Sequence, residues 1–181
     1  GRHHLACYRS VDNVKIIAVC DTKPGHAATT VKDWGLDLPA YDDMVTLIEN
    51  EKPDFVDIVT PTNTHTDLTV KALEMGCHVI CEKPVALSSA DLEEMIECSK
   101  KNNRLFTVHQ NRRFDVDYLA MQQLKDSGEI GKPIRIESRI HGSRGIPSDW
   151  RGTKEHGGGM ILDWGIHLID QLMLIYKDEV I

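Results

Sequence analysis

The feature that most constrains the fold of this chain is a regular alternation of short apolar runs with helical segments over residues 1–110. The apolar runs, which we expect to be strands, cover residues 14–20, 55–60, 78–81 and 105–109. Helices are predicted between and after them over residues 24–34, 44–50, 64–75 and 88–102. Strands that are continuously apolar are buried on both faces, which is typical of a parallel sheet covered by helices. We therefore predict a doubly wound α/β domain.

Residue types at the ends of these segments support the predicted boundaries. Ser88 precedes an amphipathic helix with an acid, Asp91, in its first turn, which is typical of a serine N-cap. Gly76 follows the helix predicted to end at Met75, and glycine commonly ends helices.

The pattern changes after residue 110. We predict, in order, a helix, a half-exposed strand with alternating polarity, a Gly-rich loop and an apolar helix over residues 114–127, 133–140, 141–159 and 160–176. This order predicts that a second domain begins at residue 111, so that the domains are 1–110 and 111–181. One strand and two helices do not make a stable domain, so we expect the natural polypeptide to extend past Ile181 and to begin before Gly1.

Composition argues against two classes of function. The net charge is −7, whereas nucleic-acid-binding proteins normally carry a basic face. No apolar run approaches the roughly 18 to 20 residues that a membrane helix needs, so we expect no membrane partner. The odd number of cysteines favours reduced, buried thiols in a cytoplasmic protein, with a zinc site as the alternative: Cys7, Cys20, Cys77, Cys81 and Cys98.

Two residues have the spacing of a dinucleotide site. Gly1 precedes a predicted helix, and Asp21 ends the next strand about 20 residues later, where an acid can accept hydrogen bonds from ribose hydroxyls. A carboxylate there repels a 2′-phosphate and so favours NAD, although the nearby Lys23 leaves NADP possible. The alternative is that Asp21 is an ordinary turn residue.

Polar loops follow three of the predicted strands, and the carboxyl ends of parallel strands are where such sheets bind ligands. The loops are residues 60–65, 82–84 and 109–113. Lys83 is the most informative residue, because an ammonium group beside a cationic nicotinamide could exchange a proton with an alcohol or polarise a carbonyl oxygen. The alternative for each loop is a solvated turn.

The last predicted helix has a polar stripe on an otherwise apolar surface. Asp163, His167 and Asp170 share one face by helical spacing, so we expect them to line a cavity or pair internally, with Asp170 a partner for His167. An exposed stripe is one alternative, and a metal site formed by Asp163 and His167, with or without His156, is another. Gly157–Gly159 precede the helix, and three glycines inside a helix would destabilise it by about 3 kcal/mol, so we expect them to be non-helical. They predict either a close approach of substrate to the backbone or a hinge.

Together these motifs resemble the Gfo/Idh/MocA (glucose–fructose oxidoreductase / inositol 2-dehydrogenase) family. The resemblance rests on residues 1–5, 60–65, 82–84, 111–115, 127–133 and 157–159, with Asp21, Asp163 and His167. It implies an N-terminal Rossmann domain, an α+β second domain that often forms oligomers, and a Lys83–Pro84 bond that is commonly cis. It implies a catalytic set of Lys83, Asp163 and His167, and the expected cofactor contacts are Gly1, Asp21, Thr60, Pro61, Asn63, His65, Glu82, Lys83 and Pro84.

The resemblance predicts an NAD(P)-dependent dehydrogenase that transfers a hydride between nicotinamide and a secondary alcohol of a sugar or polyol. We expect His167 to act as acid/base, Lys83 to polarise the reacting oxygen and Asp163 to position substrate or lysine, with Arg112, Arg113 and Arg151 as further substrate contacts. We expect a homo-oligomer. The alternatives are a non-catalytic NAD(P)-binding sensor and an NAD-dependent glycosidase or dehydratase.

Overall fold

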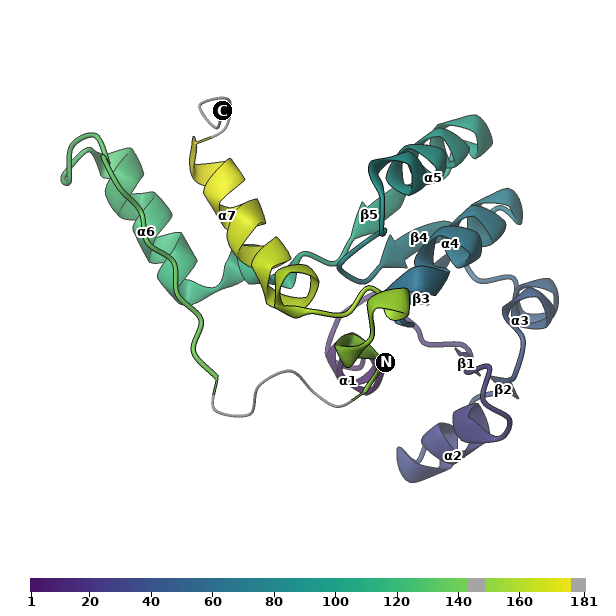
Figure 1. Cartoon of the computed structure of the whole chain (residues 1–181). Helices are drawn as coiled ribbons and strands as arrows, with labels where there is room; N and C mark the ends of the chain where they lie inside the picture. The colour runs from purple at the N-terminus through teal and green to yellow at the C-terminus, as the bar shows by residue number, and fades with distance from the viewer. Residues whose placement is uncertain (143–148, 177–181) are drawn as a thin grey trace.

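The structure is a computed structural model that describes residues 1–142 and 149–176. Its strands are β1 (Val19–Cys20), β2 (Ala40–Tyr41), β3 (Phe55–Ile58), β4 (His78–Cys81) and β5 (Phe106–Val108). Its α-helices are α1 (Arg2–Tyr8), α2 (His26–Asp33), α3 (Met44–Glu51), α4 (His65–Glu74), α5 (Ser89–Asn102), α6 (Val116–Ser127) and α7 (Ile166–Tyr176). Figure 1 shows α6 and α7 beside the part of the chain that contains the strands.

The strands form two parallel sheets among the described residues, which confirms the predicted α/β class. One sheet has the order β3-β4-β5, and the other pairs β1 with β2. In the larger sheet Ile58 is in register with Cys81, and Cys81 with Val108. The last residues of these three strands therefore lie next to one another, at one edge of the sheet.

Side-chain and glycine caps fix the helix boundaries. The Ser88 hydroxyl accepts a hydrogen bond from the backbone N–H of Asp91 at 3.1 Å, as the sequence predicted. Asp43, which the sequence analysis did not single out, caps α3 in the same way by accepting from the N–H of Thr46 at 2.7 Å. Gly76 follows α4 in the left-handed conformation (φ 88°), as expected for a residue that ends a helix.

The core lies between the larger sheet and the helices α3 and α4. Its buried members are Leu47, Ile48, Ile58, Ala72, Leu73, Cys77, Val79 and Cys81. Packing on this scale holds β3 and β4 rigidly, so the loops after them start from fixed positions.

The cysteines agree only partly with the predicted set of buried thiols. All five are free in the described residues; Cys77 and Cys81 are buried, whereas Cys7 is exposed. Burial raises the pKa of Cys81 to about 12, which leaves it an inert thiol.

Two predicted strands differ in the structure. The run over residues 14–20 pairs only at Val19–Cys20, and residues 133–140 form no ladder within the described residues. Ile134 is 99% exposed, so the alternating pattern there has no sheet to pack on. A strand needs a hydrogen-bonding partner, which a local pattern of side chains cannot supply.

The last predicted helix also differs, because it is not one regular helix. Ile161–Gly165 form a π turn, and the regular helix α7 begins at Ile166. The π turn contains Asp163, and α7 contains His167 and Asp170. The two parts of the predicted polar stripe therefore do not share the single face that regular α-helical spacing gives.

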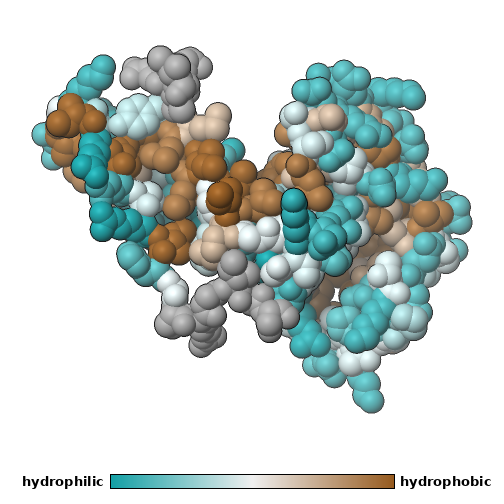
Figure 2. Space-filling model, viewed as in Figure 1, coloured by the Kyte–Doolittle hydropathy of each residue, from teal (hydrophilic) through white to brown (hydrophobic). Residues whose placement is uncertain are grey.

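Apolar side chains are exposed mainly on the later part of the chain. Figure 2 shows them gathered over α6 and α7. The most exposed are Leu105, Phe114, Val116, Ile134 and Ile161, each at least 74% accessible. In the described part of the chain no helix has the length and apolar character to cross a membrane.

Candidate active site

The three polar loops predicted to bind ligands lie at the same edge of the larger sheet. The N–H of Glu82 donates to the carbonyl of Ile58 at 2.9 Å, and the N–H of His109 donates to the carbonyl of Cys81 at 2.8 Å. These bonds continue the strand pairing by one residue past each strand. They place the loops after β3, β4 and β5 side by side, as expected for parallel strands.

Lys83, in the loop after β4, contacts the π turn before α7. Its Nζ donates to the backbone carbonyl of Asp163 at 2.6 Å and to the carboxylate Oδ1 of Asp163 at 3.0 Å. Both side chains are 17% exposed, so the ion pair is largely shielded from water. The Lys83–Pro84 peptide bond is cis. The predicted convergence of Lys83 and Asp163 is therefore present in the structure.

His167 is buried beside this pair and is held by a residue that the sequence analysis gave no role. Its Nδ1–H donates to the Oε1 of Gln110, in the loop after β5, at 2.6 Å. This bond leaves Nε2 with a free lone pair. Burial, together with the positive charges of Lys83 and Arg112, lowers the pKa of His167 to about 4, so the ring is neutral at pH 7. A neutral imidazole with a free Nε2 can accept a proton.

Asp170 is not the partner of His167, so that prediction is wrong. The carboxylate of Asp170 accepts two hydrogen bonds from Arg113, at 2.8 Å from Nε and 2.6 Å from Nη2. Helical spacing compares only residues on one helix, whereas the partners of both His167 and Asp170 come from the loop after β5. This pairing also occupies Arg113, which we had expected to contact substrate.

The other two predicted substrate arginines lie nearer the pair. The Nε of Arg151 is 3.8 Å from the Oδ1 of Asp163, although its guanidinium also bonds Asp149. The guanidinium of Arg112 stacks over the ring of Trp164, 4.3 Å from the ring centroid. Arg151 is the arginine that faces the Lys83–Asp163 pair most directly.

The predicted glycine loop packs closely against the loop after β3. A Cβ built on Gly157 would lie 3.2 Å from the Cβ of Thr62, and Gly157 has a φ of +77°. A Cβ on Gly158 would lie 2.6 Å from the carbonyl carbon of Arg151 and 2.7 Å from the carbonyl oxygen of Thr153. The loop therefore requires glycine because other parts of the chain approach its backbone closely.

The metal site considered for the last helix does not form. The Nδ1 of His156 bonds the hydroxyl of Thr153 at 2.6 Å. Among the described residues, the potential ligands that cluster are instead His4, Glu82 and His109. His4 belongs to the motif that opens the chain, but nothing in its local sequence indicated this cluster.

Several predicted cofactor residues have partners inside the protein. Both carboxylate oxygens of Glu82 accept hydrogen bonds, from His4 and His109 at Oε1 and from the backbone N–H of Lys83 at Oε2. The ring nitrogens of the buried His65 bond the carbonyls of Pro84 and Thr60. These two side chains hold the loops together rather than point outward, whereas Asn63 is exposed at the same edge.

Asp21 lies at the end of β1, as the dinucleotide spacing predicts. Its Oδ1 accepts from the N–H of Lys23 at 2.9 Å, and its Oδ2 bonds the Nδ1 of His26 at 2.6 Å. Burial would raise the pKa of Asp21, but these hydrogen bonds outweigh burial and lower the pKa. The carboxylate is thus ionised and 37% exposed, and it can accept further hydrogen bonds.

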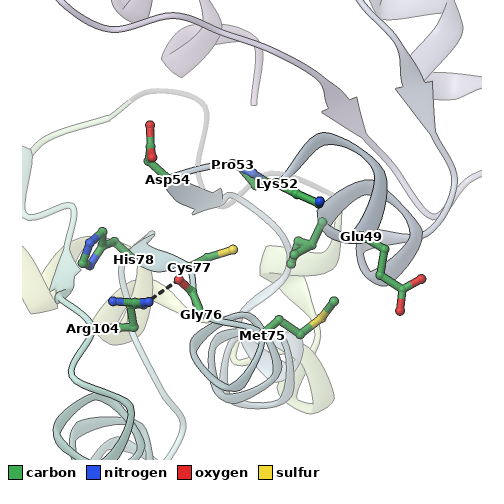
Figure 3. A pocket seen from close by; sticks show the side chains of 10 residues that line it. Glu49, Lys52, Pro53, Asp54, Met75, Gly76, Cys77, His78 and Arg104 are labelled. Atoms are coloured by element: carbon green, nitrogen blue, oxygen red, sulfur yellow. Dashed lines mark hydrogen bonds between the residues drawn. The ribbon is translucent and has the colours of Figure 1, made fainter.

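A pocket lies at the opposite edge of the sheet, near the starts of β3 and β4. Figure 3 shows its lining residues, among them Asp54, His78 and Arg104, with the Arg104 guanidinium bonded to the carbonyl of Gly76. None of the predicted site residues lines it. The ligand-binding edge of a parallel sheet is the other one, so this pocket is not the candidate site.

A parallel α/β sheet that gathers a lysine, an aspartate and a neutral histidine at its carboxyl edge has the organisation of a dinucleotide-dependent oxidoreductase. Residues 1–110 match the Gfo/Idh/MocA family, described as an oxidoreductase family with an NAD-binding Rossmann fold. Residues 118–181 match the Gfo/Idh/MocA C-terminal domain. The chain belongs to this family, and its fold is of the Rossmann type.

Similar proteins include two inositol dehydrogenases. Inositol 2-dehydrogenase from Salmonella typhimurium is 32% identical over 81% of this chain and 44% of its own length. Myo-inositol 2-dehydrogenase from Thermotoga maritima is 32% identical over 99% of this chain and 53% of its own length. A solved structure of an NAD-binding protein from Listeria innocua has a TM-score of 0.90 and 41% identity, covering 96% of this chain and 51% of that one. The chain spans about half the length of the curated relatives it matches.

The residues present fit NAD, the cofactor of this family. Asp21 offers an ionised, partly exposed carboxylate to ribose hydroxyls. Gly1 is the N-cap of α1, in the position before a helix that the dinucleotide spacing predicts. The carboxylate of Asp21 favours NAD over a cofactor with a 2′-phosphate, which it would repel.

Proposed function

We propose that this protein is an NAD-dependent dehydrogenase that oxidises a secondary alcohol of a sugar, polyol or sugar derivative. The observation that carries the proposal is the Lys83–Asp163 pair, with bonds of 2.6 and 3.0 Å, beside a neutral His167. The family match and the inositol dehydrogenases among the relatives support the class of reaction.

In the proposed reaction the Nε2 of His167 accepts the proton of the substrate hydroxyl, because Gln110 occupies Nδ1. The Lys83 ammonium donates a hydrogen bond to the reacting oxygen and stabilises its developing negative charge. Asp163 holds that ammonium in place. When bound, NAD supplies the hydride acceptor at the nicotinamide C4.

The same residues act in the reverse direction when a carbonyl is reduced. Lys83 then polarises the carbonyl oxygen, and the protonated His167 returns its proton. We further propose that Arg151 contacts substrate hydroxyls near Asp163, and that Asp21 and Asn63 contact the cofactor. NADP use, the homo-oligomer and the cytoplasmic location stay predictions from the sequence.

A spectrophotometric screen tests the proposal. The purified protein is mixed with NAD or NADP and with each member of a panel of inositols, other polyols and aldoses, and absorbance is followed at 340 nm. We expect NADH formation with at least one cyclic polyol or aldose. Cofactor binding with no absorbance change for any substrate would contradict the dehydrogenase assignment and favour a sensor, while product formation without net NADH would favour a glycosidase or dehydratase.

A further inference from the structure

A buried charge cluster lies behind the Lys83 loop, and no proposed step uses it. His4, on α1, is 7% exposed and lies between two carboxylates. Its Nδ1 is 2.8 Å from the Oδ2 of Asp57, on β3, and its Nε2 is 2.7 Å from the Oε1 of Glu82, after β4. The cluster thus joins one helix to two neighbouring strands.

The geometry defines the charge of His4. Both ring nitrogens face carboxylate oxygens, which can only accept, so both must carry hydrogen and the ring is an imidazolium. The hydrogen bonds to Asp57 and Glu82 outweigh burial and raise the pKa of His4 to about 9. The ionisable rings beside it are His3 and Tyr8 on the same helix and His109 after β5, with ring centroids 6.3, 6.4 and 4.3 Å away.

Glu82 connects this cluster to the proposed catalytic lysine. Burial alone would raise the pKa of Glu82, but the hydrogen bonds from His4, His109 and the Lys83 backbone lower it to about 2. Its Oε1 bonds the two imidazoles, and its Oε2 accepts the backbone N–H of Lys83 at 2.9 Å. The carboxylate is therefore fixed at both oxygens, and one of them holds the main chain of Lys83.

We propose that His4 is a positioning residue for Lys83 and acts through the Glu82 carboxylate. The imidazolium holds Glu82 in the rotamer that binds the Lys83 backbone, and this fixes the start of the side chain whose Nζ contacts Asp163. The cluster replaces the water that would otherwise solvate Glu82 at this edge. The inference rests on the proposed role of Lys83 in catalysis.

The alternative to a protonated cluster is a bound metal ion, because the potential ligand atoms of His4, Glu82 and His109 lie within 4.8 Å of one another. Tetrahedral zinc with bonds of about 2.0–2.1 Å would hold its ligand atoms about 3.3 Å apart. Here the imidazole nitrogens are 2.7 and 2.9 Å from one Glu82 oxygen, which is hydrogen-bonding distance. The atoms face one another rather than an open centre, so the geometry favours the protonated cluster.

A double-mutant cycle tests the proposal in the whole protein. We expect H4Q and E82Q each to lower kcat at least tenfold with little change in NADH affinity. The kcat of the double variant should lie within threefold of that of the less active single variant. The control is H3Q, which changes the exposed neighbouring histidine and should match wild type. Multiplicative losses in the double variant, or a kcat for H4Q equal to that of H3Q, would overturn the proposal.

NMR separates this proposal from the proposed function. The ring protons of His4 should titrate with a pKa about 9 in wild type and clearly lower in E82Q, whether or not a substrate is known. If His4 titrates near 6.5 in wild type, the cluster is wrong even in an active enzyme. If His4 titrates near 9 but no substrate is turned over, the proposed function fails instead. A loss of activity on EDTA treatment that zinc restores would assign the cluster to a metal.

Discussion

Replacing Lys83 with methionine is the most direct test of the candidate active site. Methionine keeps the length and the apolar stem of lysine but removes the ammonium group. The wild-type Nζ makes two short bonds to Asp163, at 2.6 and 3.0 Å, where both side chains are 17% exposed. The variant therefore loses both the donor proposed for the reacting oxygen and the partner of a shielded carboxylate.

The expected magnitude follows from these contacts. Removing one donor that is aimed at developing negative charge costs about 100- to 1000-fold in kcat. Breaking a fully buried ion pair destabilises a protein by about 3–5 kcal/mol, and partial exposure of both partners reduces this to about 2 kcal/mol. We expect K83M to remain folded, with a melting temperature roughly 4–8 °C lower.

The assay measures initial rates at 340 nm with both substrates saturating, and NADH affinity by quenching of tryptophan fluorescence. K15M, which removes an exposed lysine, is the matched control and should have wild-type kinetics. A K83M variant that binds NADH normally and keeps kcat within tenfold of wild type would refute the role given to Lys83.

Three further predictions concern the rest of the site. Wild-type kcat/KM for alcohol oxidation should not fall as the pH is lowered through 6.5, because His167 has a pKa of about 4 and stays unprotonated there. The Q110E variant places a negative charge beside the Nδ1–H of His167 and raises the pKa of that ring. A pH profile should therefore show a lower kcat/KM for Q110E than for wild type at pH 6. G158A should lower the free energy of unfolding by about 1–3 kcal/mol in denaturant titrations, because its methyl group meets main-chain atoms, whereas G142A meets none and should be neutral. D21S should move the ratio of kcat/KM for NAD to that for NADP at least tenfold toward NADP, and an unchanged ratio would remove Asp21 from cofactor selection.

Much of the fold follows from the sequence, because its elements carry local information. The helix Ser89–Asn102 and the strand His78–Cys81 lie where the cap and the apolar run predict them. Residues 14–18 and 133–140 were predicted as strand but form no ladder. Their apolar pattern is compatible with a strand, yet pairing depends on a partner that the pattern does not specify.

The candidate site was predictable to a similar extent. The approach of Lys83 to Asp163 follows from the edge at which parallel strands end and from the need to place a polar stripe. The bonds of His167 to Gln110 and of Asp170 to Arg113 each join residues 57 positions apart. Spacing along one helix cannot identify such partners, which depend on how the helix packs on the loop after β5.

The π turn at Ile161–Gly165 makes the chain unusually sensitive to length at this point. Successive side chains of a regular helix are rotated by about 100° around the helix axis. The one extra residue of a π turn therefore rotates the side chains before the turn relative to those after it. Here that rotation directs Asp163 to Lys83, while His167, farther along, meets Gln110. Deleting one residue between Asp163 and His167 would rotate the Asp163 carboxylate away from the Lys83 ammonium group while leaving both side chains in the sequence. A one-residue deletion in this turn would therefore disturb the candidate site more than most substitutions.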